Sequence, residues 1–155
     1  CVLLALPYAI GEMEYERLFA DRLYVAFPHD DPRDPPDTIP PETIDETRLL
    51  LLEDGHCLKD QALAACNRPE LRAEARMMGT SLHTLVQMVD NGLGLTMLPE
   101  MAIRAGILDH TSIVARPLKS EHATRDITLV WRKSSPRDKE LRLFATLLRE
   151  AWPNS

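Results

Sequence analysis

A run of four leucines at residues 49–52 constrains the fold of this chain more than any other feature. The run is short enough for a strand buried on both faces, which is typical of a sheet covered by helices. An Asp-Gly turn follows, and residues 56–67 are mostly good helix formers. The same order of strand and helix recurs along most of the chain. It predicts an α/β fold with a largely parallel sheet.

The other elements are predicted from the same local patterns. Residues 80 or 81 can cap a helix whose apolar face carries Leu82, Leu85, Val86 and Val89, with Gly92 at its end. Six prolines make residues 28–41 a surface loop. Further strands are expected at 1–6, 15–20, 21–27, 74–79, 94–98, 112–117 and 126–132, and further helices at 100–105 and from 135 onward.

Composition narrows the class of protein. The formal charge of −6 makes the chain a poor candidate for contacting phosphate backbones itself. No apolar run approaches the length of a membrane span, so none is expected. Three cysteines are too few for a secreted disulfide scaffold, which favours a cytoplasmic location with free thiols. Because residue 1 is Cys1 rather than Met, we expect a fragment or one domain of a longer protein.

Cys57 is the candidate nucleophile. It follows a predicted strand-to-helix turn, where the positive end of the helix dipole stabilises a thiolate. His56 is its neighbour, and Lys59 is two residues further on. The alternative is that Cys57 is a small buried apolar residue.

Cys66 is its candidate partner. In a continuous helix, nine residues advance about 13–14 Å, whereas a disulfide needs Cα atoms about 4.4–6.8 Å apart. The two cysteines therefore cannot bond while the helix stands, an arrangement that suits a switch and not a permanent crosslink. The alternative is that Cys66 simply packs beside Leu63.

Two other chemistries are weaker. His56, Cys57, Asp60 and Cys66 are potential metal ligands, but no Cys-x-x-Cys or His-x-x-x-His pair accompanies them. Ser81 and His83 lack the Gly-x-Ser-x-Gly elbow of a hydrolase. We therefore expect no metal and no cofactor.

Residues 55–61, Gly-His-Cys-Leu-Lys-Asp-Gln, with a second cysteine at 66, resemble the redox-sensing segment of the OxyR family. These are the peroxide-responsive LysR-type transcription regulators. Residues 50–55, 80–85, 89–94, 98–99 and 124–132 are also similar to that family. The resemblance implies a LysR effector domain like a periplasmic binding protein, built from two Rossmann-like subdomains. Residues 1–20 and 123–155 would form part of an incomplete subdomain I, residues 21–122 would form subdomain II, and the N-terminal winged helix-turn-helix would be absent.

The resemblance also implies roles for individual residues. Cys57 would be the peroxidatic cysteine and Cys66 the resolving one, which condenses with a Cys57 sulfenic acid. Thiolate stabilisation and the peroxide pocket would involve Gly55, His56, Asp60 and Arg125. Candidate dimer-interface residues are Leu82, Leu85, Val86, Val89 and Asn91.

The implied protein is a regulator and not an enzyme. It would detect hydrogen peroxide, induce antioxidant genes, form a homodimer or homotetramer, and bind promoter DNA through the absent domain, with RNA polymerase as a further partner. A second hypothesis is an effector domain that binds a small metabolite between its subdomains, with the cysteines incidental. A third, a thiol peroxidase, predicts a thioredoxin-like layout that this chain lacks.

Overall fold

A computed structural model describes residues 1–7, 10–32, 35–53, 57–66 and 78–152 of the chain. They divide into two compact units: unit 1 is Cys1–Asp21 with Arg125–Ser155, and unit 2 is Arg22–Thr124. The division predicted from the sequence, at residues 20/21 and 122/123, lies beside these boundaries. That the units are the two regulatory subdomains stays a prediction.

Unit 1 is a strand layer with one long helix. Strand β1 (Val2–Leu6) pairs antiparallel with β7 (Thr124–Arg132), and β7 neighbours the first part of β2 (Met13–Phe27). Helix α4 (Asp138–Ala151) begins three residues later than Ser135, because Ser135 instead accepts a hydrogen bond from the Arg137 amide in a turn before the helix. Of the residues on α4, Ala145 is buried. Two of its large apolar side chains, Phe144 and Leu147, are exposed.

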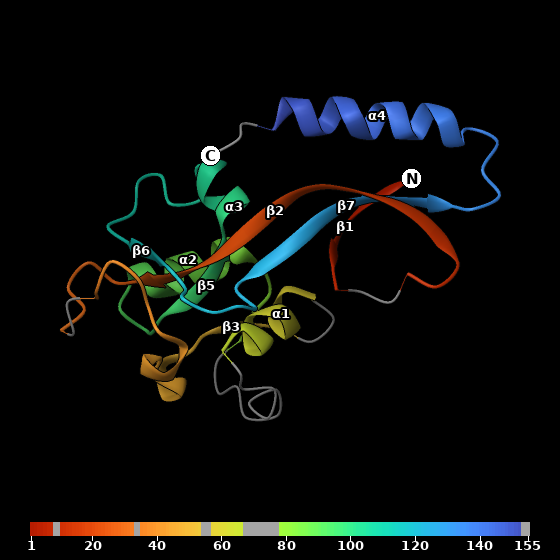
Figure 1. The fold of residues 1–155 in the computed structure, drawn as a ribbon. Coiled ribbons are helices and arrows are strands. Elements are labelled where there is room, and N and C mark those ends of the chain that lie inside the picture. The colour runs from red at the N-terminus through yellow and green to blue at the C-terminus, as the bar shows by residue number, and fades with distance from the viewer. Residues whose placement is uncertain (8–9, 33–34, 54–56, 67–77, 153–155) are drawn as a thin grey trace. The chain divides into compact units, whose positions relative to one another are not determined.

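Unit 2 contains the remaining elements (Figure 1). The second part of β2 lies between β5 (Thr96–Pro99) and β6 (Val114–Pro117), and both pairs are antiparallel. Strands β3 (Leu51–Leu52) and β4 (Met78–Gly79) pair in parallel. The helices are α1 (Cys57–Ala65), α2 (Leu82–Asp90) and α3 (Glu100–Arg104), with short 3-10 turns η1 (Pro41–Thr43) and η2 (Glu46–Arg48).

The expectation of a largely parallel sheet is wrong for the strands paired with β2 in unit 2 and for β1 and β7, which pair antiparallel. The parallel pair β3–β4 flanks α1, as expected where a helix carries the chain between neighbouring strands. However, the chain enters unit 2 along β2 and leaves it for unit 1 soon after β6. Strands β2 and β6 therefore run in opposite directions. The prediction treated every strand as a member of a strand–helix–strand repeat.

The leucine run is buried in the core of unit 2, as predicted, but only Leu51 and Leu52 form a strand. All four leucines are at most 6 % exposed, and α1 packs Leu58, Ala62 and Leu63 into the same core. The turn after α2 joins this core because the amide of Leu95 donates to the carbonyl of Arg48. A side chain at Gly94 would overlap that carbonyl oxygen, so only glycine fits there. The packing of Leu58, Ala62 and Leu63 in the same cluster as Leu51 and Leu52 holds α1 against β3.

Among the helices of the described residues, none has the length and apolar character that crossing a membrane requires.

Candidate functional site

Helix α1 carries one cysteine at each end. Cys57 is its first residue and is exposed, whereas Cys66 follows its last residue and is 4 % exposed. The amide of Cys66 donates to the carbonyl of Ala62 at 3.2 Å, so helical hydrogen bonding continues to this residue. Both cysteines are free thiols.

The intact helix keeps the two cysteines apart. Nine residues of α-helix separate their Cα atoms by about 13–14 Å along the axis, which exceeds the span of a disulfide. In this state the side chains cannot bond. A Cys57–Cys66 disulfide requires α1 to unwind.

Cys66 is held in the core of unit 2. Its sulfur lies 4.0 Å from the sulfur of Met97, a side chain that is 2 % exposed. Solvent therefore has little access to Cys66, and an oxidant from solution meets Cys57 first.

Two other predicted residues lie in the first turn of α1. Asp60 is exposed. Lys59 is 2 % exposed, and its Nζ lies 3.7 Å from the sulfur of Met78 on β4. The Lys59 ammonium is thus directed into unit 2 and joins α1 to β4. Gly55 and His56 lie outside the described residues, and their roles stay predictions.

Arg125 forms a buried ion pair within unit 1. Its Nε and Nη2 donate to one carboxylate oxygen of Asp21, at 2.9 and 2.8 Å. The Asp21 side chain is 0 % exposed and that of Arg125 is 10 % exposed. Nothing in the local sequence identified Asp21 as the partner, because the two residues are 104 positions apart. An action of Arg125 on Cys57 stays a prediction.

Most of the candidate dimer-interface residues face the interior of their own unit. Leu85, Val86 and Val89 are at most 2 % exposed and pack in the core of unit 2. The apolar face of α2 thus covers strands of its own unit. Leu82 is half-buried, and Asn91 is exposed with its side chain bonded to the Gln87 carbonyl. A dimer contact through α2 stays a prediction.

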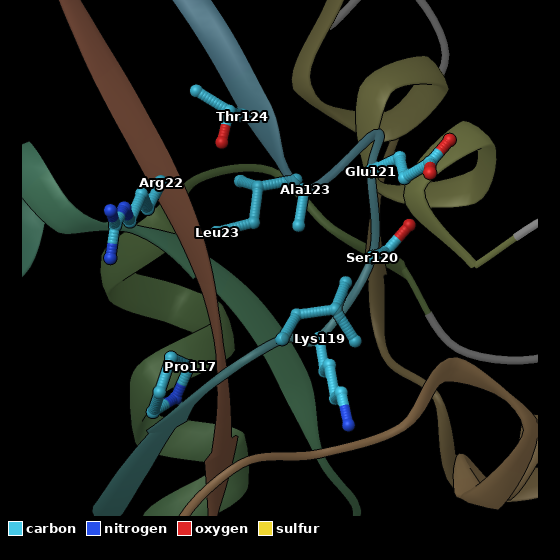
Figure 2. Close-up of a pocket in the computed structure, with 9 residues that line it drawn as sticks. Arg22, Leu23, Pro117, Lys119, Ser120, Glu121, Ala123 and Thr124 are labelled. Carbon is cyan, nitrogen blue, oxygen red and sulfur yellow. The ribbon is translucent and has the colours of Figure 1, made fainter.

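A second feature that sequence reasoning missed is a pocket of about 530 Å³ in unit 2, lined by residues 22–23, 117–121 and 123–124. Figure 2 shows the hydroxyls of Ser120 and Thr124 among the lining residues, together with the apolar side chains of Leu23 and Ala123. The cationic ends of Arg22 and Lys119 do not converge on one point. The volume suits a small molecule, and the lining mixes both charge signs with apolar carbon.

Metal binding gains no support from this arrangement. Over the part of the chain that the structure describes, no three His, Cys, Asp or Glu side chains form a group that could hold a metal ion.

Comparison with known proteins identifies the family. The model of the LysR substrate binding domain matches residues 1–153. The chain is 34 % identical over 149 residues to the HTH-type transcriptional regulator EstR of Acinetobacter baylyi, covering 96 % of this chain and 49 % of EstR. It is also 34 % identical over 149 residues to a probable hydrogen peroxide-inducible genes activator of Mycobacterium avium, covering 96 % and 48 %. This chain therefore belongs to the LysR substrate-binding-domain family.

Within that family its structure is similar to regulatory domains of OxyR proteins. A single-residue variant of the OxyR2 regulatory domain from Vibrio vulnificus superposes with a TM-score of 0.85 at 38 % identity, covering 97 % of this chain and 72 % of that one. The resemblance inferred from the sequence is confirmed, as is the α/β fold of this family. The chain spans about half the length of the curated relatives it matches.

Proposed function

We propose that this chain is the peroxide-sensing part of a LysR-type transcription activator. The observation that carries the proposal is the placement of two free cysteines at opposite ends of one intact helix, one exposed and one buried. The relatives support a regulator and not an enzyme, and one of them is named as a hydrogen peroxide-inducible activator.

The first step is oxidation of Cys57. Its thiolate attacks hydrogen peroxide, the O–O bond breaks, and one oxygen stays on sulfur as a sulfenic acid. The other oxygen leaves as hydroxide, which takes a proton from solvent and becomes water. Cys57 is the first residue of α1 and is exposed, so hydrogen peroxide can reach its sulfur. We assign His56 and Arg125 to thiolate stabilisation, and Gly55 and Asp60 to the peroxide pocket.

The second step joins the two cysteines. The Cys66 thiol condenses with the sulfenic acid, releasing water and forming the disulfide. Because the intact helix separates the sulfurs, α1 unwinds and Cys66 leaves its contact with Met97. The crosslink restricts a short loop, which the chain-entropy treatment values at about 2.5–3 kcal/mol. That amount is enough to shift a two-state element.

In the whole protein, this change would reach promoter DNA through a winged helix-turn-helix domain outside this sequence. The expected assembly is a homodimer or homotetramer in the cytoplasm, with contact to RNA polymerase and induction of antioxidant genes. These statements rest on the family and on the redox chemistry proposed for α1.

Treatment with one equivalent of hydrogen peroxide tests the proposal. The wild-type chain should lose two thiols and two hydrogens of mass, with a peptide that links residues 57 and 66. Hydrogen exchange of amides 58–65, slow in the reduced chain, should become fast. Cys66→Ser should stop at a sulfenic acid that dimedone traps, and Cys57→Ser should show neither product.

Cys1→Ser is the matched control, because Cys1 is also exposed and lies in unit 1. It should form the 57–66 link at the wild-type rate. An intramolecular disulfide in Cys57→Ser, or equal exchange of amides 58–65 in both redox states, would refute the mechanism.

A second candidate function is binding of a small metabolite, with the cysteines incidental. The similarity to EstR, which is not named as a peroxide sensor, and the pocket of about 530 Å³ in unit 2 favour it. In that case, peroxide at one equivalent should leave both Cys57 and the exchange of α1 unchanged.

A further inference from the structure

Lys59 and Met78 form a contact that neither the sequence patterns nor the redox proposal uses. The Nζ of Lys59 donates to the sulfur of Met78 at 3.7 Å, joining the first turn of α1 to β4. A thioether is a weak hydrogen-bond acceptor. The contact is therefore a weak link at the point where the helix with both cysteines meets the strand layer of unit 2.

Met78 is accessible although Lys59 is not. The side chain of Met78 is 46 % exposed, whereas Lys59 is 2 % exposed. Exposure differs among the other methionines, since Met13 is 43 % exposed and Met97 is 2 % exposed. Because oxidation of methionine follows exposure, Met13 and Met78 are open to oxidants and Met97 is protected.

We infer that Met78 is a second oxidation site, and that its sulfoxide stabilises α1 in the helical state. The oxidant is a hydroperoxide. The Met78 sulfur donates an electron pair to one peroxide oxygen, the O–O bond breaks, and the other oxygen leaves as water after proton transfer. The product is methionine sulfoxide, which methionine sulfoxide reductases can return to methionine.

The stabilising effect follows from the geometry. A sulfoxide oxygen is a stronger acceptor than a thioether, and hydrogen bonds from an ammonium are among the stronger ones in proteins. With Nζ 3.7 Å from Sδ, an oxygen on that sulfur can lie about 2.8 Å from Nζ in a bent S–O···N arrangement. Oxidation of Met78 would thus strengthen the link between α1 and β4.

The consequence for signalling rests on the proposed function. Thiolates react with peroxide faster than thioethers do, so Cys57 would respond first and Met78 at higher oxidant exposure. Because the disulfide requires α1 to unwind, a stabilised helix would slow its formation. Oxidised Met78 would then slow the formation of the Cys57–Cys66 disulfide.

The first test uses the 155-residue chain carrying Cys57→Ser, so that no disulfide can form between residues 57 and 66. After excess hydrogen peroxide, tandem mass spectrometry should find sulfoxide at Met78 and Met13 at comparable rates and little at Met97. Protection of Met78 while Met13 is oxidised would overturn the assignment.

The second test mimics the two oxidation states in the same background. Met78→Gln supplies an amide oxygen, and Met78→Leu supplies no acceptor. Hydrogen exchange of amides 58–65 should be about three- to tenfold slower in Met78→Gln than in Met78→Leu. The control Met13→Gln should leave this exchange unchanged. Adding Lys59→Met should abolish the difference between the Gln and Leu variants.

Equal exchange in the Gln and Leu variants, or a difference that persists with Lys59→Met, would overturn the inference. With Cys57 restored, Met78→Gln should slow disulfide formation by the same factor. A third outcome is slower exchange in Met78→Gln with no Cys57–Cys66 disulfide in any variant. This outcome supports the Met78 site and contradicts the proposed function, so the two failures are distinguishable.

Discussion

Asp21 and Arg125 form an ion pair that is almost completely buried, with side chains 0 % and 10 % exposed. Both side chains are withdrawn from water, and both guanidinium contacts go to the same carboxylate oxygen. The sequence resemblance suggested only that Arg125 supports a thiolate. Its contacts add a structural role in unit 1, where it joins β2 to β7.

Arg125→Ala should therefore lower the free energy of unfolding of unit 1 by about 3 kcal/mol, because it removes a buried ion-pair partner of the Asp21 carboxylate. Tryptophan fluorescence during urea unfolding measures this, since Trp131 and Trp152 both belong to unit 1.

The matched control is Arg17→Ala. Arg17 pairs with Asp126, but the two side chains are 60 % and 40 % exposed, so the expected loss is about 0–1 kcal/mol. Similar losses of unfolding free energy in both variants would show that burial does not make the Asp21–Arg125 pair more stabilising than the exposed pair.

At the scale of elements, α4 is attached to its strands by a polar network. Asp138 accepts hydrogen bonds from Arg142 and from the indole of Trp131, each at 3.0 Å. Arg142 also reaches Glu14 and Glu16 on β2. The hydrogen bond from Arg142, followed by that from Trp131, holds the pKa of Asp138 below its usual value of 3.8.

This shift predicts the acid sensitivity of α4. Because the folded-state pKa is depressed, the stabilisation by Asp138 is present above about pH 3.8 and is lost as the pH falls through the lower folded value. Urea unfolding of unit 1 at pH 5 and pH 2.5 should show a smaller loss of stability on acidification in Asp138→Asn than in the wild type.

Glu150→Gln, an exposed carboxylate near the other end of α4, should retain the wild-type loss. If Asp138→Asn and the wild type lose equal stability on acidification, the Asp138 contacts do not contribute to holding α4.

At the scale of the whole molecule, the net charge of −6 disfavours binding of this chain to nucleic acid. Binding to a phosphate backbone draws its free energy from basic side chains that displace counterions. We expect no binding of the 155-residue chain to a fluorescent DNA duplex in anisotropy measurements, even at about 20 mM salt, where electrostatic attraction is strongest. Micromolar binding that weakens with added salt would contradict this expectation.

Local patterns in the sequence were sufficient to predict several helices, turns and caps and the position of the cysteines on α1. The leucine run, the Ser81 cap of α2, the glycine after its end and the start of α1 near Cys57 all appear in the structure. These features depend on residues a few positions apart, because capping, turns and helical hydrogen bonds are short-range interactions. The separation of Cys57 from Cys66 followed for the same reason, once the helix between them was assigned.

Contacts between distant segments were decided only by the tertiary structure. Arg125 meets Asp21 across 104 positions, Lys59 meets Met78 across 19, and the apolar face of α2 covers strands of its own unit. Strand direction was mispredicted for a related reason, since it depends on how the chain enters and leaves a unit. A helix pattern shows that one face is apolar, but what covers that face depends on the path of the whole chain, because burial is a property of packed surfaces and not of neighbouring residues.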